Sequence, residues 1–181
     1  VFDGLCSRPY VEDDPARPIN AYGRSKYQGE IAVLSHQLAG VTYRTSWVMG
    51  IEGHNFIHTM LRLGKERREL FVVNDQWGSP TFGLDLADIS LKLLDNYPNQ
   101  NEIFHFSNQG VTNWSDFAKE TLKHAKIEKQ VVPISSGKNK TLAPRPKRSV
   151  LGTSKIQSYL GISPRPWQEA LAECVDQLIY G

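Results

Sequence analysis

Residues 20–48 read NAYGRSKYQGEIAVLSHQLAGVTYRTSWV and show a helix pattern followed by a strand pattern. Apolar or small residues recur at helical spacing from Asn20 to Leu38, which predicts a helix that ends before Gly40. The next segment, Val41 to Val48, is rich in β-branched and aromatic residues, which is typical of a strand. A helix that leads directly into a strand is the basic unit of an α/β fold.

The same alternation continues along the rest of the chain. The patterns predict helices at Phe56–Arg68, Leu84–Leu94, Asn113 or Ser115 to about Lys126, Thr153–Leu160 and Pro166–Ile179, strands at Leu70–Val73 and Glu102–Ser107, and loops at Asp75–Gly83, Asn96–Asn101 and Ser135–Arg148. Strands separated by helices indicate an α/β fold with a mainly parallel sheet.

Composition places the chain among ordinary globular proteins. It has 181 residues, of which 40% are hydrophobic and 22% charged, and no apolar run approaches the ~20 residues that span a bilayer. Its two cysteines, Cys6 and Cys174, match no metal-site spacing, which fits a reducing compartment. A net charge of +2 is too small to indicate nucleic acid. We therefore expect a soluble cytoplasmic protein with neither a membrane nor a nucleic-acid partner.

The beginning of the chain suggests that a part of the fold lies upstream. Val1-Phe2-Asp3-Gly4 resembles the end of an apolar strand that enters a turn. The strand count is low for a doubly wound domain, and the Gly-rich fingerprint of dinucleotide-binding folds is absent. We expect the missing half to precede Val1.

Tyr22 and Lys26 form a Tyr-x-x-x-Lys pair at the start of the first predicted helix. The i, i+4 spacing places the phenol and the ammonium on one helix face. A nearby cation favours the phenolate, which makes the phenol a usable general acid toward a carbonyl that is being reduced. Taken alone, the spacing also fits a surface tyrosine beside a solvated lysine, which stays an alternative.

Many further segments match one family in order along the whole chain. They are Val1 to Gly4, the signature residues Pro18, Asn20, Tyr22, Gly23, Ser25, Lys26, Gly29 and Glu30, Arg44 to Val48, Asn55-Phe56, Thr59 to Leu63, Asn74 to Thr81, Arg145-Pro146, Ser149, Leu151 and Trp167. On these residues the chain resembles the dTDP-4-dehydrorhamnose reductases, which belong to the extended short-chain dehydrogenases. The resemblance implies the C-terminal part of a Rossmann-like fold with a substrate-binding subdomain, in which residues 1–181 lack the N-terminal Gly-rich βαβ half.

The resemblance also implies catalytic and cofactor-binding roles. Tyr22 would donate a proton to the C4 ketone, Lys26 would bind the nicotinamide ribose, and Thr45 and Ser46 would lie against NADPH or NADH. The family's catalytic Ser/Thr precedes the segment that corresponds to Val1–Gly4 and is therefore outside the chain. The isolated chain is for this reason expected to be an incomplete, inactive catalyst.

Six residues are expected to bind the nucleotide sugar by the same resemblance: Trp47, Asn55, Phe56, Gln76, Thr81 and Arg145. An indole can pack on the apolar face of a deoxyhexose, although a strand Trp is commonly a core residue. Asn55 and Phe56 begin a helix, whose free N–H groups attract phosphate. For Gln76 and Thr81, simple turn chemistry is the alternative.

A basic run comprises Lys138, Lys140, Arg145, Lys147 and Arg148. Such a run is usually solvated surface, and the absence of interleaved aromatic residues weakens a nucleic-acid interpretation. Because Arg145 matches the family's Arg-Pro, we assign it to the diphosphate of the nucleotide sugar.

His54 and His58 stand at i, i+4 without a third ligand, so no metal site is assigned. Some members of the family use a divalent ion at a dimer contact, but no motif here identifies one. A homodimer is left open.

The resemblance implies reduction of dTDP-4-dehydro-β-L-rhamnose to dTDP-β-L-rhamnose with NAD(P)H, in dTDP-rhamnose biosynthesis. Two alternatives stay open. The first is a non-catalytic regulatory subunit of the same fold, as in S-adenosylmethionine synthesis. The second is another epimerase or dehydratase of the superfamily, which fits Arg44 to Val48 and Asn74 to Thr81 less well. The choice between NADH and NADPH cannot be made from these residues.

Overall fold

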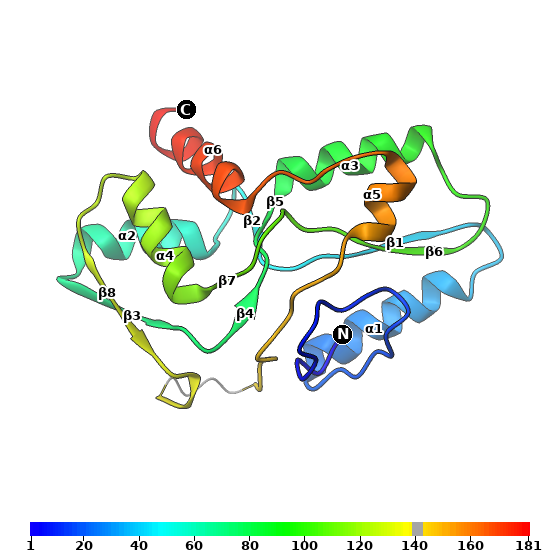
Figure 1. Ribbon diagram of the computed structural model, residues 1–181, viewed down its shortest axis with the longest axis horizontal. Coiled ribbons are helices and arrows are strands. Elements are labelled where there is room, and N and C mark those ends of the chain that lie inside the picture. The colour runs from blue at the N-terminus through cyan, green and yellow to red at the C-terminus, as the bar shows by residue number, and fades with distance from the viewer. Residues whose placement is uncertain (139–142) are drawn as a thin grey trace.

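A computed structural model describes residues 1–138 and 143–181 (Figure 1). In chain order the elements are α1 (Ala21–Leu34), β1 (Val41–Arg44), β2 (Val48–Met49), α2 (Phe56–Glu66), β3 (Glu69–Val73), β4 (Trp77–Gly78), β5 (Thr81–Phe82), α3 (Gly83–Asp95), β6 (Glu102–His105), β7 (Thr112–Asn113), α4 (Trp114–His124), β8 (Gln130–Ile134), the short 3₁₀ helix η1 (Ser136–Lys138), α5 (Ser154–Leu160) and α6 (Trp167–Tyr180). The predicted α/β class is confirmed.

One half of the molecule is built around the parallel pair β1–β6. Helix α1 lies against one face of this pair, and α3 and α5 lie toward the other (Figure 1). Phe104 of β6 is fully buried among side chains of α3 and α5, including Ile89 and Ile156. This half therefore has the helix–sheet–helix layering that the alternation of elements predicts.

The other half places α2 and α4 against the parallel pair β3–β8 (Figure 1). Strand β8 was not predicted, because Pro133 interrupts a short apolar run that carries no clear alternation. The whole strand is nevertheless paired with β3, from Glu69 opposite Gln130 to Val73 opposite Ile134.

The prediction of one continuous strand from Val41 to Val48 is wrong. It is divided into β1 and β2 by residues 45–47, where Trp47 adopts a left-handed backbone with φ of 48°. The chain turns here because β2 pairs with a different partner, β5, instead of continuing beside β6. The break lies next to the residues predicted to contact cofactor and sugar.

The predicted loop Asp75–Gly83 is also corrected, since it contains the short strands β4 and β5. Strand β4 pairs with β7 in antiparallel orientation, whereas the other three strand pairs among the described residues are parallel. The expected mainly parallel sheet thus exists as separate two-stranded pairs. Two-residue strands carry no periodicity, so sequence patterns do not reveal them.

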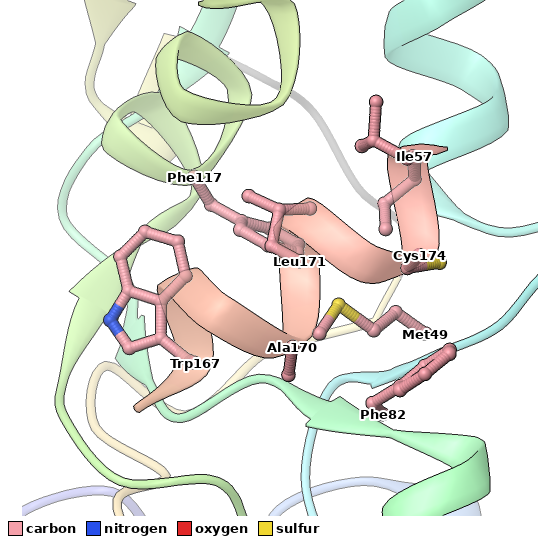
Figure 2. Close-up of a cluster of buried hydrophobic side chains, with 9 residues drawn as sticks. Met49, Ile57, Phe82, Phe117, Trp167, Ala170, Leu171 and Cys174 are labelled. Atoms are coloured by element: carbon pink, nitrogen blue, oxygen red, sulfur yellow. The ribbon is translucent and has the colours of Figure 1, made fainter. Parts of the chain in front are cut away.

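Helix α6 joins the two halves through a buried apolar cluster (Figure 2). Trp167, Ala170, Leu171 and Cys174 lie on α6 and are buried against side chains from α2, α4, β2 and β5, such as Phe117. Residues three and four apart on α6 thus form one continuous apolar face, as its sequence spacing predicts.

The helices otherwise end within a few residues of their predicted limits, and α4 is capped by Asn113, whose side chain accepts a hydrogen bond from Asp116 N at 3.0 Å. Among the described residues, no helix has the length and apolar character that crossing a membrane requires. Lys140 of the basic run lies outside the described residues.

Candidate active site

Tyr22 and Lys26 lie at the N-terminal end of α1, and local hydrogen bonds hold this end. Asn20 caps the helix by accepting a bond from Gly23 N at 2.7 Å. The amide of Asn20 also donates to Pro144 O at 2.8 Å, which ties the segment before Arg145 to the helix. The Lys26 ammonium is 5.6 Å from the centre of the Tyr22 ring, so the two groups share one face.

A cavity of about 370 Å³, called the catalytic cavity below, opens beside this pair. Its lining side chains come from the chain start, α1, β1 and the segment after Arg145, and they include Tyr22, Lys26, Glu30, Arg44, Thr45, Ser46, Pro146, Arg148 and Ser149. The four residues predicted to serve catalysis and cofactor binding therefore line one cavity. Tyr22 is 72% exposed, so its hydroxyl is accessible.

Thr45 and Ser46 are held on the wall of the catalytic cavity by hydrogen bonds to the β4–β5 region. The Thr45 hydroxyl donates to the Thr81 hydroxyl at 3.1 Å, and the Ser46 hydroxyl donates to Ser79 O at 2.7 Å. Thr81 is fully buried and its hydroxyl donates to Ser46 O at 2.8 Å. Thr81 thus supports the site from behind, and it has no exposed surface for a direct substrate contact.

A buried ionic group lies beneath the pair. The Arg44 guanidinium donates to both carboxylate oxygens of Glu30, with Nε to Oε2 at 2.8 Å. Its Nη1 is 3.2 Å from His105 Nε2, while His105 Nδ1 is 3.0 Å from Tyr10 O. Because Arg can only donate and a carbonyl can only accept, the ring is neutral with its proton on Nδ1. Burial lowers the pKa of His105.

This ionic group joins α1 to the strands. Glu30 lies one helical turn after Lys26, and Arg44 is the last residue of β1. The charged hydrogen bonds between them fix how α1 sits on β1, and with it the position of Tyr22 and Lys26.

A second cavity of about 350 Å³, called the arginine cavity below, is lined by three of the predicted substrate residues, Phe56, Gln76 and Arg145, together with Trp114. Arg145 lines the arginine cavity and the next residue, Pro146, lines the catalytic cavity, so one segment of the chain contributes to the walls of both.

Trp47 lines neither cavity. Its ring stacks on Trp114 with centroids 3.7 Å apart and an interplanar angle of 9°, and it packs against the apolar cluster of Figure 2. Gly78 permits this position, because a Cβ there would lie 2.5 Å from Cε2 of Trp47. The core-packing interpretation and the predicted sugar contact both fit a half-buried ring, so the sugar contact stays a prediction.

Asn55 lies at the start of α2, where it caps the helix. Its side chain accepts bonds from Ile57 N at 2.9 Å and His58 N at 3.3 Å. These N–H groups are therefore already bonded, which removes the reason given for phosphate binding at this helix end. His54 is exposed, and in the described part of the chain no group of three or more metal-ligating side chains occurs.

Trp114 and Arg148 were not predicted as site residues. Trp114 could have been noticed only as an aromatic residue at a helix start, and Arg148 was placed in the basic run with its neighbours. Neither residue type carries a spacing signal, since both reach their cavities from segments distant in the sequence.

An α/β scaffold that presents a Tyr-x-x-x-Lys pair beside a cavity defines the class of the short-chain dehydrogenases and their extended relatives. Within that class, the RmlD substrate binding domain family matches residues 1–180, and the chain belongs to it. This family membership confirms the resemblance found in the sequence.

Individual relatives agree with this placement. The spore coat polysaccharide biosynthesis protein SpsK of Bacillus subtilis is 40% identical over 98% of the chain, which covers 61% of that protein. The dTDP-4-dehydrorhamnose reductase of Burkholderia thailandensis is 36% identical over 99% of the chain and is covered to 65%. The chain thus spans a little under two thirds of the length of these relatives.

Solved structures give the same result. A dTDP-4-dehydrorhamnose reductase from Bacillus anthracis, in complex with NADP, is 37% identical with a TM-score of 0.93, and it matches 98% of this chain and 62% of its own. A UDP-galactose 4-epimerase shares only the fold, at 16% identity and a TM-score of 0.80.

Proposed function

We propose that the protein is an NAD(P)H-dependent reductase that converts dTDP-4-dehydro-β-L-rhamnose to dTDP-β-L-rhamnose. The observation that carries this proposal is the shared cavity, where Tyr22 and Lys26 meet Thr45 and Ser46. The names of the relatives support it, since several are dTDP-4-dehydrorhamnose reductases. Residues 1–181 would form the C-terminal portion of such a reductase, with the Tyr-Lys helix and the sugar-nucleotide-binding subdomain.

The residues present suit this chemistry. A bound nicotinamide cofactor would supply the hydride. The Tyr22 hydroxyl is accessible in the cavity and would donate its proton to the oxygen that develops negative charge at C4. Lys26 would stabilise the resulting phenolate from the same helix face and hydrogen-bond the nicotinamide ribose.

The dTDP moiety would extend into the arginine cavity. Phe56 and Trp114 offer aromatic faces there, and Arg145 offers a charged fork for the diphosphate. Since one segment, Arg145 and Pro146, contributes to the walls of both cavities, one elongated ligand would extend from one cavity to the other.

The test is ketosugar-dependent oxidation of NADPH, followed at 340 nm, with NADH in a parallel series. Turnover of dTDP-4-dehydro-β-L-rhamnose supports the proposal. Ligand binding without any turnover in a protein that includes the Gly-rich loop favours the alternative of a non-catalytic binding module.

A second ketosugar deserves a parallel assay. A relative from Streptomyces niveus, 38% identical over 96% of the chain, is a dTDP-4-keto-6-deoxy-D-glucose reductase. Faster turnover of that substrate would keep the reaction type and change the sugar.

A further inference from the structure

The catalytic cavity carries two unpaired positive charges. Four charged side chains line it: Glu30, Arg44, Lys26 and Arg148. Glu30 and Arg44 neutralise each other through their ion pair. Lys26 and Arg148, in contrast, form no ion pair with any residue that the structure describes. The cavity wall therefore has an excess of two positive charges.

Arg148 is the less expected of these two cations. Its Nε atom is buried and has no hydrogen-bond partner among the described residues. A buried donor without a partner is costly, so its presence calls for a group that accepts its hydrogen bond. The half-buried Arg148 side chain thus keeps one buried N–H donor that no described residue satisfies.

The backbone around Arg148 is held firmly. Trp77 N donates to Lys147 O at 2.8 Å, and Ser149 N donates to Trp77 O at 2.8 Å, so a bond flanks Arg148 on each side. Pro146, two residues before Arg148, is also fixed in position, because it packs closely on Gly4. A Cβ atom on Gly4 would lie only 2.5 Å from the Cβ of Pro146. The main chain of Arg148 is therefore fixed in position, and its planar guanidinium is a rigid hydrogen-bonding fork.

We propose that Arg148 binds a phosphate group of the ligand in the catalytic cavity, an inference that rests on the proposed function. A guanidinium fork matches phosphate oxygens bidentately, and the buried Nε of Arg148 has a donor available for one of them. Arg145 and Arg148 then contribute one arginine to each cavity from the same segment of the chain. The phosphate belongs either to the dinucleotide cofactor or to the diphosphate of the nucleotide sugar.

The experiment is calorimetric titration of the purified protein and its variants with dTDP, with NADPH, and with thymidine as a ligand without phosphate. The variants are Arg148→Gln, Arg148→Lys and, as a matched control, Lys147→Gln. Lys147 is a neighbouring exposed cation that lines neither cavity. Circular dichroism and thermal unfolding establish whether each variant is folded. If Arg148→Gln does not fold, Arg148→Lys, which keeps the charge but loses the planar fork, is the variant that tests the inference.

We expect Arg148→Gln to raise the dissociation constant of one phosphate ligand about ten- to a hundred-fold, with a smaller rise in Arg148→Lys and none in Lys147→Gln. Weaker binding of dTDP but not of thymidine assigns the phosphate to the nucleotide sugar, whereas weaker binding of NADPH assigns it to the cofactor. Equal constants for Arg148→Gln and Lys147→Gln with both ligands overturn the inference, as does failure of the unchanged protein to bind either ligand. An Arg148 effect on dTDP, combined with no ketosugar turnover in a protein that includes the Gly-rich loop, would overturn the proposed function alone.

Discussion

Tyr22 projects from the first turn of α1 into a cavity that Lys26 shares, and most of its ring is exposed. In a protein that includes the Gly-rich loop, Tyr22→Phe should lower turnover of the ketosugar by ~100-fold or more, as expected for the loss of a general acid. Binding of dTDP should change little, because only a hydroxyl is lost. Steady-state NADPH oxidation measures the first quantity and calorimetry the second. Near-normal turnover in Tyr22→Phe would show that another group donates the proton.

Arg145 lines the arginine cavity with Phe56 and Gln76, apart from the Tyr22 hydroxyl. In a protein that includes the Gly-rich loop, Arg145→Ala should raise KM for the nucleotide sugar about ten- to a hundred-fold, as expected for the loss of a charged hydrogen bond to phosphate, with a smaller effect on kcat. The reason is that the phosphate lies distant from the reacting C4, so ground and transition states lose the contact equally.

Lys147→Ala is the control for Arg145→Ala, since Lys147 carries the same charge in the same segment and lines neither cavity. Equal, small effects of both substitutions would show that the segment contributes only general charge and that Arg145 contacts no phosphate.

At the scale of elements, the ion pair of Arg44 and Glu30 attaches α1 to β1. Arg44→Met should lower the free energy of unfolding by about 3–5 kcal/mol, because it leaves a buried carboxylate without its partner. Replacing Glu30 as well, in Arg44→Met/Glu30→Gln, should restore most of the loss. Urea unfolding measures both.

The matched control is Lys92→Met, which removes an exposed i, i+4 pair with Asp88. Exposed pairs contribute little, so we expect a change below about 1 kcal/mol. A similarly small change in Arg44→Met would mean that the buried pair does not fasten α1.

His105 of β6 makes the same region sensitive to acid. Burial chiefly lowers its pKa from the ordinary 6.5, Arg44 lowers it further and Glu12 opposes the shift. The folded protein therefore keeps the ring neutral where the unfolded chain takes up a proton, so stability is complete above 6.5 and declines as the pH falls below it.

The corresponding measurement is urea unfolding at pH 7.5 and pH 5.5. The unchanged protein should lose more stability over this interval than His105→Gln, which has no ring to protonate. Equal losses in both proteins would assign the acid sensitivity to other groups.

At the scale of the whole molecule, the two cavities bring together Tyr22 and Lys26 in one and Phe56, Gln76 and Arg145 in the other, but no Gly-rich phosphate loop occurs in residues 1–181. We expect this 181-residue chain to bind NADPH weakly and to lack ketosugar reductase activity, because that loop provides most of the backbone N–H donors to a dinucleotide. Calorimetric titration with NADPH checks this, with dTDP as the comparison. Tight, stoichiometric NADPH binding would contradict it.

Much of the molecule was predictable because the relevant interactions are local. The helices α1, α2, α3, α4 and α6 follow from residues three and four apart, and the Tyr22–Lys26 face follows from the same spacing. The family, too, could be recognised from ordered motifs alone, and the match over residues 1–180 confirms it.

Contacts between segments that are distant in the sequence were decided only by the tertiary structure. The division of the strand at Trp47, the pairing of β8 with β3, the burial of Thr81 and the separation of Arg145 from Arg148 into two cavities all depend on such contacts. Strand pairing and side-chain burial are set by neighbours tens of residues away, about which a local pattern carries no information. The residue types could therefore be read from the sequence, and their assignment to cavity, core or ion pair required the fold.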